Sequence, residues 1–280
     1  MAFIDADKVE LPQRAILSVE GMKGTGKSRF GLWGRAPVAM LRFDQASEGA
    51  LRELRGLRKG AIKVSTFDFE KPSTEKKDNK VLKADDEIIS MATKIYMDFV
   101  TDYRWALANG FKTIVVDDSA TPWDLLRLIR LGKLAQVPPE RYAFVNAEFK
   151  RLLKEALEHE ATLVLLTPLR EEWSDYIDES GKRKSGRTGK WEPTGFKNVD
   201  YLAHAIVRLY RAGDPTDPAN KPLADPRCGD FCAEIRKCNE NGMLVGQTVN
   251  FAEYAEIGIQ NTFGIIMSMV YPNTEPSQWL

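Results

Sequence analysis

The sequence predicts an α/β fold with a largely parallel central sheet. Short apolar segments typical of buried strands alternate along the chain with stretches in which apolar residues recur at helical spacing. A glycine-rich segment, GMKGTGKS, stands between one such strand and a helical pattern, as expected for a strand–loop–helix unit. The length of 280 residues suits one main core. We therefore expect residues 1–280 to form a single domain.

The elements of this domain follow from apolar patterning. The expected strands are Ala15–Val19, Val38–Phe43, Ile62–Phe67, Thr113–Val116, Thr162–Thr167, Ala203–Tyr210 and Phe231–Arg236. A segment dense in Pro, Gly and Asp separates the last two, which predicts an antiparallel hairpin near the C-terminus. Apolar stripes at helical spacing over residues 88–106 and 145–156 predict helices that flank the sheet. A charged run over residues 70–84 predicts a solvated insertion.

Composition excludes several classes of protein. Forty basic and forty acidic residues cancel, so the chain as a whole has no field that would draw it to nucleic acid or to anionic lipid. The apolar runs are too short to span a bilayer, and the start, MAFIDADKVE, lacks the pattern of a signal peptide. We expect a cytoplasmic protein without a membrane partner. The spacing of Cys228, Cys232 and Cys238 is unlike that of zinc ligands and predicts reduced thiols.

The segment GMKGTGKS matches the phosphate-binding pattern G-x-x-x-x-G-K-[ST]. Glycines let backbone N–H groups surround a β-phosphate, Lys27 reaches the β and γ oxygens, and the Ser28 hydroxyl serves as a ligand of Mg²⁺. ATP and Mg²⁺ are the expected cofactors. The residues expected to hold the nucleotide are Gly21, Met22, Lys23, Gly24, Thr25, Gly26, Lys27, Ser28 and Arg29.

The second lysine of the loop tests one subclass of ATPases. Partition and ion-pump ATPases with a deviant loop carry a signature lysine five residues before the main one. Met22 occupies that position here, and Lys23 lies only four residues before Lys27. We therefore reject that subclass and interpret Lys23 as a surface charge near the phosphates.

A second motif ends the strand Thr113–Val116, which runs into Asp117 and Asp118. A buried strand ending in acids is typical of a Walker B motif, in which Asp117 would hold the magnesium and Asp118 would orient or deprotonate the attacking water. The alternative is that the acids cap the following helix, since Ser119, Thr121 and Pro122 favour a helix start.

The order of these parts resembles that of RecA-like ATPases, especially the compact phage nucleotide-binding proteins proposed to act in single-strand annealing or recombination. The order comprises the phosphate loop, FDQASEG, the Asp117 strand and LVLLTPLREEW, and the resemblance covers roughly residues 14–254. The resemblance implies that a carboxylate just beyond a central strand activates water. Glu48 is the matching candidate and Asp44 a less well placed one, in competition with Asp118; Glu48 can instead open a helix.

The resemblance assigns a role to the end of the strand Thr162–Thr167 as well. Thr167 matches the polar residue that senses the γ-phosphate in that family. The chain departs from the family at Pro168 and Leu169, where relatives often carry polar residues or histidine.

A basic segment follows this strand. Residues 171–198 are rich in Gly, Lys and Arg, and we expect a flexible loop that binds single-stranded DNA, because cations follow a phosphate backbone and aromatic rings stack on bases. The expected DNA-binding residues are Lys182, Arg183, Lys184, Arg187, Lys190 and Trp191. The alternative is a solvated loop without a ligand.

The late strand FCAEIRKC resembles the family strand whose cations reach the nucleotide of a neighbouring subunit. Arg236 and Lys237 are thus candidates for stabilising the transferring phosphoryl group in trans, which implies a homo-oligomer. The alternative is that both are ordinary exposed strand charges.

Together these features predict a Mg-ATP-hydrolysing ATPase that acts on single-stranded DNA in phage-type recombination, annealing or replication, with a single-strand binding protein or another recombination factor as a further partner. Two rival functions fit the same motifs. One is a small-molecule kinase in which residues 182–190 form a basic lid. The other is a nucleotide-gated assembly module with little turnover.

Overall fold

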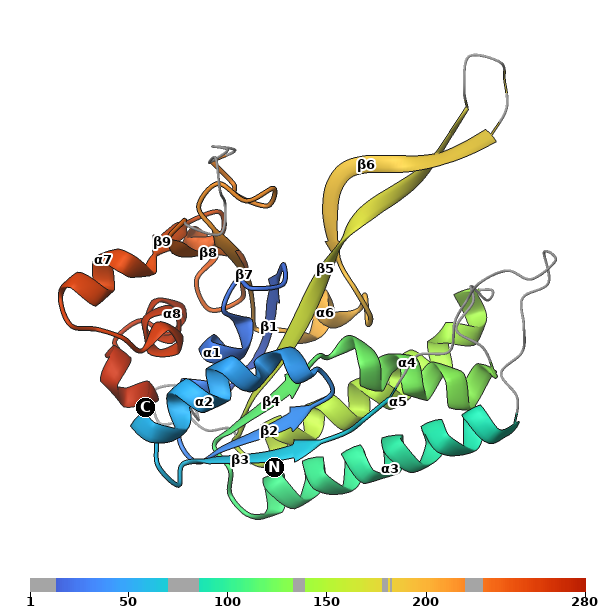
Figure 1. Cartoon of the computed structure of the whole chain (residues 1–280), viewed down its shortest axis with the longest axis horizontal. Helices are drawn as coiled ribbons and strands as arrows, with labels where there is room; N and C mark the ends of the chain where they lie inside the picture. The colour runs from blue at the N-terminus through green and yellow to red at the C-terminus, as the bar shows by residue number, and fades with distance from the viewer. Residues whose placement is uncertain (1–13, 70–85, 133–138, 178–180, 182, 220–228) are drawn as a thin grey trace, which may run out of the picture.

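A computed structural model describes residues 14–69, 86–132, 139–177, 181, 183–219 and 229–280 (Figure 1). The elements in chain order are β1 (Ile16–Gly21), α1 (Lys27–Leu32), β2 (Val38–Arg42), η2 (Gln45–Ser47), α2 (Glu48–Leu57), β3 (Ile62–Thr66), α3 (Asp86–Ala108), β4 (Thr113–Asp117), α4 (Ala120–Leu131), α5 (Pro139–Glu158), β5 (Thr162–Ile177), β6 (Arg183–Pro193), α6 (Val199–Leu202), β7 (Ala205–Arg211), β8 (Phe231–Cys238), η4 (Gly242–Leu244), β9 (Thr248–Asn250), α7 (Phe251–Glu256), α8 (Thr262–Val270) and η5 (Pro276–Trp279).

One sheet organises the molecule, with strand order β3-β2-β4-β5-β1-β7-β8-β9. Across the sheet, β3, β2, β4, β5, β1 and β7 are parallel to one another, whereas β8 and β9 add antiparallel pairings at one end. The predicted α/β class, the mostly parallel sheet and the antiparallel hairpin near the C-terminus are confirmed. Strand β5 lies between β1 and β4, so it separates the strand of the phosphate loop from the strand that ends at Asp117.

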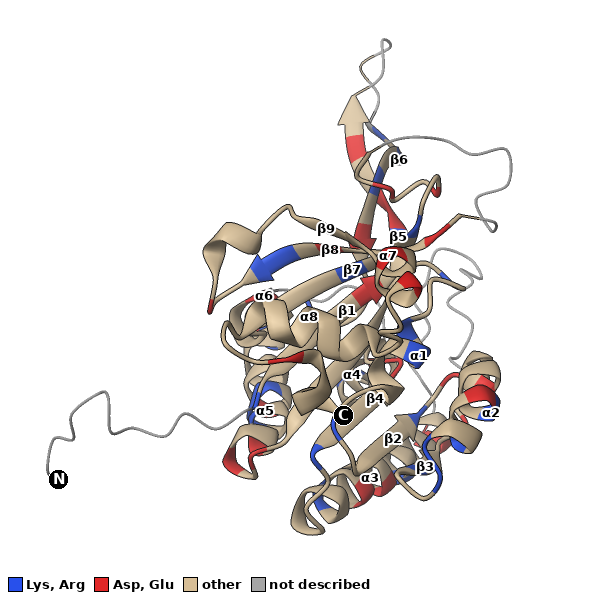
Figure 2. Cartoon of the chain, turned by 90° about the vertical axis from the view of Figure 1, so that its left-hand side faces the viewer, with Lys and Arg blue, Asp and Glu red and all other residues tan. Residues whose placement is uncertain are grey.

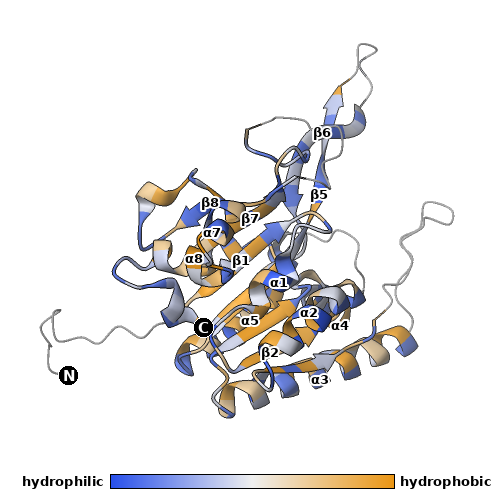
Figure 3. Cartoon of the chain, turned by 60° about the vertical axis from the view of Figure 1, so that its left-hand side comes forward, coloured by the Kyte–Doolittle hydropathy of each residue, from blue (hydrophilic) through white to orange (hydrophobic). Residues whose placement is uncertain are grey.

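Helices cover both faces of the sheet, as parallel strands require. Helices α3, α4 and α5 pack one face through aromatic residues that include Phe99, Tyr103 and Phe149. The other face is covered by α1, α2 and α8, with Phe30, Phe263 and the buried Trp279 in the layer between. The hydrophobic residues gather on these central strands, while the end of β5 is mostly hydrophilic (Figure 3). None of the helices in the described ranges is long and apolar enough to cross a bilayer.

The expected flexible loop over residues 171–198 is wrong over most of its length. Strand β5 continues past Thr167 to Ile177 and pairs with β6 as an antiparallel ribbon, with register from Leu169↔Pro193 to Ile177↔Arg183 (Figure 1). Trp173 and Tyr176 of β5 lie opposite Arg187 and Lys184 of β6, and Glu171 forms an ion pair with Arg187, so cross-strand contacts support this pairing. The expected charged insertion, residues 70–84, lies outside the described residues.

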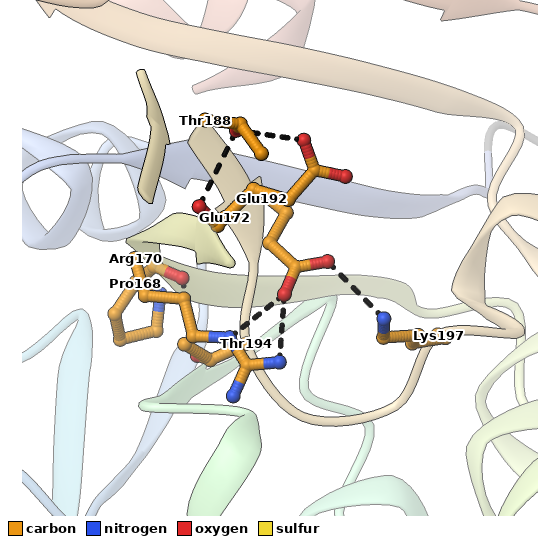
Figure 4. A network of polar contacts seen from close by, with 7 residues as sticks. All are labelled: Pro168, Arg170, Glu172, Thr188, Glu192, Thr194 and Lys197. Atoms are coloured by element: carbon orange, nitrogen blue, oxygen red, sulfur yellow. Dashed lines mark hydrogen bonds and ion pairs between the residues drawn. The ribbon is translucent and has the colours of Figure 1, made fainter. Parts of the chain in front are cut away.

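Polar contacts fix the ribbon where it leaves the body (Figure 4). Thr194 donates to the Pro168 carbonyl oxygen from its backbone nitrogen at 3.0 Å and from its hydroxyl at 3.1 Å. Glu192 receives hydrogen bonds from Arg170 at 2.9 and 2.7 Å and from Lys197 at 3.1 Å. The base of the ribbon is therefore held at a defined position one residue beyond Thr167.

Candidate functional site

The candidate site lies at the carboxyl edge of the sheet. The parallel strands β1, β2 and β4 end there at Gly21, Arg42 and Asp117, and β5 passes the same level at Thr167, in register with Glu20. The carboxyl edge is where open α/β sheets place their ligands, because the loops after adjacent strands converge there. The fold thus gathers residues from distant parts of the chain around the GMKGTGKS loop.

The loop has a compact form that depends on its glycines. Gly26 has φ +86° just before α1, a conformation that side chains disfavour. A Cβ atom on Gly21 would lie 2.6 Å from the Leu209 carbonyl oxygen, so no other residue fits at the end of β1 without a shift. The Thr25 hydroxyl donates to the Met22 carbonyl oxygen at 2.9 Å and closes the turn. The predicted glycines are thus required by the backbone and by close packing.

Lys27 lies across this loop. Its ammonium group donates to the carbonyl oxygens of Gly21 at 2.8 Å and Met22 at 2.7 Å. Burial lowers the pKa of Lys27 to about 8, although Asp117, Asp44 and Asp118 oppose this shift. The cation is desolvated and lies among carbonyl and carboxylate oxygens. A bound phosphate would favour its charged form.

Ser28 and Asp117 meet at the start of α1. The Ser28 hydroxyl donates to Asp117 Oδ2 at 2.7 Å, although the two residues are 89 positions apart. Burial raises the pKa of Asp117 to about 6, and the bond from Ser28 opposes the rise. A hydroxyl and a desolvated carboxylate at hydrogen-bond distance are hard oxygen donors of the kind Mg²⁺ prefers. These two side chains therefore fit the expected magnesium site and would complete it with nucleotide oxygens and water.

The carboxylates near Asp117 differ in what they contact. Asp118 Oδ1 accepts a hydrogen bond from the Thr121 backbone nitrogen at 2.7 Å, so one of its oxygens caps the start of α4. Asp44 accepts from the Ala46 backbone nitrogen at 2.8 Å, and its charge raises the pKa values of both Lys27 and Asp117. Asp44 and Asp118 thus lie beside the phosphate loop.

Glu48 lies elsewhere. It begins α2, its side chain is 59% exposed, and Oε1 is 3.8 Å from the Arg42 guanidinium. It lines a shallow cavity of about 330 Å³ whose other lining residues are Arg42, Leu51, Arg52, Arg55, Ile62 and Val64. The structure therefore brings Asp44, rather than Glu48, into the group of charges around Lys27 and Asp117.

Thr167 contacts the loop that follows β4. Its hydroxyl and that of Ser119 share a hydrogen bond of 2.9 Å, and both residues are buried. The Ser119 backbone nitrogen also donates to the Leu166 carbonyl oxygen at 2.9 Å. Thr167 is therefore linked directly to the segment that carries Asp117 and Asp118. Sequence patterning identified Ser119 only as a helix-start residue, since its contact with β5 is non-local.

Lys237 lies away from the phosphate loop of its own chain, whereas the charge of Arg236 acts on Glu20, the residue before Gly21, and opposes the rise in the pKa of that carboxyl. Lys237 pairs with Ile206 near the start of β7, whereas the loop adjoins the end of β7. The Lys237 ammonium donates to the backbone carbonyl oxygens of Asp200 and Ala203. Arg236 is exposed. A role for either residue toward a neighbouring copy stays a prediction.

The expected DNA-binding residues lie on or beside β6. Lys184, Arg187 and Lys190 are exposed and Trp191 is half-buried, while Lys182 and the side chain of Arg183 lie outside the described residues. Arg187 pairs with Glu171 at 3.2 Å and lies 5.7 Å from the Trp173 ring centre. Basic and acidic residues both occur along the ribbon (Figure 2). The ribbon is therefore nearer to charge balance than its basic strand alone predicts.

Sequence reasoning missed one cation beside the loop. Arg211, at the end of β7, has Nε 3.4 Å from the Gly24 carbonyl oxygen. Its position at the carboxyl end of a strand was the available signal, but the sequence does not show that β7 adjoins β1. The thiols of Cys232 and Cys238 are free and buried, and Cys228 lies outside the described residues.

No model of a protein family matches the chain. The search of curated proteins finds no match either.

Proposed function

We propose that the chain is a P-loop ATPase of RecA-like type that binds Mg-ATP and hydrolyses it in association with single-stranded DNA. The observation that carries the nucleotide part is the contact of Ser28 with Asp117 at 2.7 Å beside the desolvated Lys27. A phosphate-binding loop, a metal-binding hydroxyl and a strand-end carboxylate meet at one edge of the sheet, as phosphoryl transfer requires.

Each residue of the site has a distinct task in this proposal. Lys27 would neutralise charge on the β and γ phosphoryl oxygens, and Ser28 and Asp117 would hold Mg²⁺, which would supply further charge neutralisation to the phosphates. Thr167 detects the terminal phosphate and is linked through Ser119 to the Asp117 segment. Asp118 or Asp44 orients the attacking water, since both carboxylates lie beside Lys27.

The DNA part of the proposal depends on the ribbon. β5 carries Thr167 and continues without a break into the ribbon, so a ligand on the ribbon is connected to the phosphate site by one strand. Trp173, Tyr176 and Ile177 are exposed by 60%, 51% and 75% of their surface. Exposed aromatic rings next to cations suit the stacking of unpaired bases along a phosphate backbone. Assembly into a homo-oligomer, with Arg236 serving a neighbouring site, belongs to the same proposal.

The test is ATP hydrolysis by the full chain with Mg²⁺, measured with and without single-stranded DNA. Lys27→Ala should abolish turnover, whereas the matched control Lys94→Ala, which changes an exposed lysine of α3, should retain it. A variant with Lys184, Arg187 and Lys190 changed to alanine should keep the basal rate and lose stimulation by DNA. Stimulation that persists in this variant would remove the ribbon from the proposal.

A small-molecule kinase is a second candidate, and one observation favours it. The cavity beside Glu48 carries Arg42, Arg52 and Arg55 around aliphatic side chains, which suits an acceptor with an anionic group. A kinase of this kind would be insensitive to DNA and would lose transfer in Arg52→Ala and Arg55→Ala variants, while a DNA-dependent ATPase would tolerate both. Nucleotide binding without turnover in any condition would instead favour the gated assembly module.

A further inference from the structure

Arg211 occupies the side of the phosphate loop that faces away from Asp117. Strand β7 lies next to β1 on the side opposite β5 and ends at this residue. The guanidinium donates to the Gly24 carbonyl oxygen from Nε at 3.4 Å and to the Gly229 carbonyl oxygen from Nη1 at 3.0 Å. A planar cation is thus fixed against the loop without any acidic side chain among these contacts.

The guanidinium also stacks on an aromatic ring. Its Cζ atom is 3.8 Å from the ring centre of Phe231, the first residue of β8. The same ring packs against the loop, because a Cβ atom on Gly26 would lie 3.3 Å from it. Phe231 therefore fills the space beside Gly26 and supports one face of Arg211, and both residues are half-buried.

Backbone contacts hold this pair in place before any ligand binds. The Arg211 backbone nitrogen donates to Asp214 Oδ2 at 2.9 Å, and Asp214 Oδ1 accepts from the backbone nitrogen and hydroxyl of Thr216 at 2.7 and 2.6 Å. Gly229 lies so close to the Ala212 backbone that an added Cβ atom would be 2.0 Å from the Ala212 carbonyl oxygen. The chain on both sides of the pair is therefore constrained, and the plane of the guanidinium is preorganised.

The direction of a bound nucleotide follows from the opposite side of the loop. The magnesium-binding pair Ser28 and Asp117 lies toward β4, and Asp44 and Asp118 add negative charge there. Terminal phosphates held at Lys27 and Ser28 leave the nucleoside at the other end of the triphosphate. The carboxylates disfavour the β4 side for the rest of an anionic ligand, whereas the β7 side offers a cation with a flat face.

We propose that Arg211, supported by Phe231, is the stacking platform for the base of the bound nucleoside triphosphate. The inference rests on the proposed nucleotide function and adds a recognition element for the nucleoside. The base lies on the guanidinium face that is not in contact with Phe231, and the ring keeps that face parallel to the base. Arg211 contributes to nucleoside binding, whereas Lys27 and Ser28 contribute to phosphate binding.

Two ligands separate these contributions: Mg-ATP, and inorganic tripolyphosphate with Mg²⁺, which has the phosphates without a base. Affinities are measured by calorimetry on the full chain for the unaltered protein, Arg211→Ala, Arg211→Lys and Lys27→Ala. The matched control is Arg104→Ala, which removes an exposed arginine paired with Glu155 on the face covered by α3. Circular dichroism and thermal melting establish that each variant is folded.

Arg211→Ala should weaken ATP about tenfold and leave tripolyphosphate within about twofold, because one base stack is lost. Arg211→Lys should behave like the alanine variant, since lysine restores the charge but not the planar guanidinium group. If Arg211→Ala fails to fold, Arg211→Lys provides the test. Equal weakening of both ligands would show that Arg211 only braces the loop, and unchanged ATP affinity would show no role; either result overturns the inference. If the unaltered protein and Lys27→Ala bind both ligands equally poorly, the nucleotide function itself fails.

Discussion

The charged groups around the phosphate loop are partly desolvated, whereas those on the β5–β6 ribbon are paired in contact with water. Around the loop, Lys27, Asp44, Asp117 and Asp118 lie at a partly dry sheet edge, where burial shifts the pKa values of Lys27 and Asp117 toward their neutral forms. On the ribbon, opposite charges pair across strands in contact with water, as Arg187 does with Glu171. The proposed ligand, with its phosphates and a divalent cation, would favour the charged forms of both groups. Salt should therefore weaken the ion pairs of the ribbon more than the interactions around the loop.

The sharpest test of this difference compares two ion pairs of similar length. Arg208 and Glu20 are 3.0 Å apart beneath the loop with side chains 10% and 5% exposed, whereas Arg170 and Glu192 are 2.7 Å apart at the ribbon base with 58% and 24% exposed. Arg208→Ala should lower the free energy of unfolding by about 3–5 kcal/mol, because it leaves Glu20 buried without its partner. Arg170→Ala should cost less than about 1 kcal/mol.

Urea denaturation of the two variants measures both effects. A control that replaces the buried pair together, Glu20→Gln with Arg208→Met, should cost less than Arg208→Ala because no charge stays buried. Burial already raises the pKa of Glu20 against the opposing influence of Arg208. Equal losses at the two sites would mean that the region beneath the loop is as well hydrated as the ribbon.

Asp117→Asn should stabilise the ligand-free protein. The folded-state pKa of about 6 lies above the ordinary value of 3.8, so the fold favours the protonated carboxyl. The unfolded chain releases this proton at lower pH, and stability therefore falls as the pH rises from about 4 to about 6 and is level above. Asparagine removes that loss while its carbonyl oxygen still accepts from Ser28, which gives a gain of about 3 kcal/mol at pH 7.

Unfolding measured from about pH 4 to about pH 8 tests this prediction. The difference between the variant and the unaltered protein should grow with pH through the window and then stay constant. The same variant should lose Mg-dependent nucleotide binding, so stability and function should change in opposite directions. A difference that is the same at every pH would contradict the desolvation of Asp117.

The loop and the ribbon also differ in how far their sequence determines them. The phosphate loop depends on glycine and lysine within a few residues, so local pattern predicts it, and the acids at the end of the Thr113–Asp117 strand were expected beside it. The position of Glu48 was harder to predict from the sequence. The 3-10 turn η2, capped by Asp44, places Glu48 at the exposed start of α2. Asp44 and Ser47 close that turn through local hydrogen bonds, but the sequence does not show which side of it faces Lys27.

The ribbon was misjudged for a related reason. Its composition of Gly, Lys and Arg is typical of a mobile loop, but its stability comes from cross-strand pairs such as Glu171 with Trp191 and Tyr176 with Lys184. The composition of the segment does not show which of its residues face one another across the ribbon. The adjacency of Arg211 to the loop is hidden in the same way, since it requires the sheet order.

Removing acids from the ribbon should strengthen DNA binding modestly. Glu171→Gln with Asp175→Asn leaves the pairing of the strands unchanged and removes two negative charges near Arg187 and Ser185. Affinity for a single-stranded oligonucleotide, followed by fluorescence anisotropy at several salt concentrations, should rise several-fold. Each cation that contacts phosphate contributes about 0.7 to the salt slope, so Lys184→Ala and Lys190→Ala should each lower it by about that amount. If neither the removal of the acids nor the removal of the lysines changes the affinity, DNA does not bind the ribbon.

The smallest effect concerns the ribbon alone. The Tyr176 ring covers Gly186, where an added Cβ atom would lie 2.9 Å from the ring. Tyr176→Ala removes this diagonal cross-strand contact and should destabilise the ribbon by about 0.5–1 kcal/mol. Because a two-stranded ribbon has few other contacts, the loss should appear as faster amide exchange in β5 beyond Leu169 and in β6, with exchange in β1 and β4 unchanged. Faster exchange in β1 as well would mean that the ribbon and the phosphate loop open together, in which case β5 transmits disorder between them.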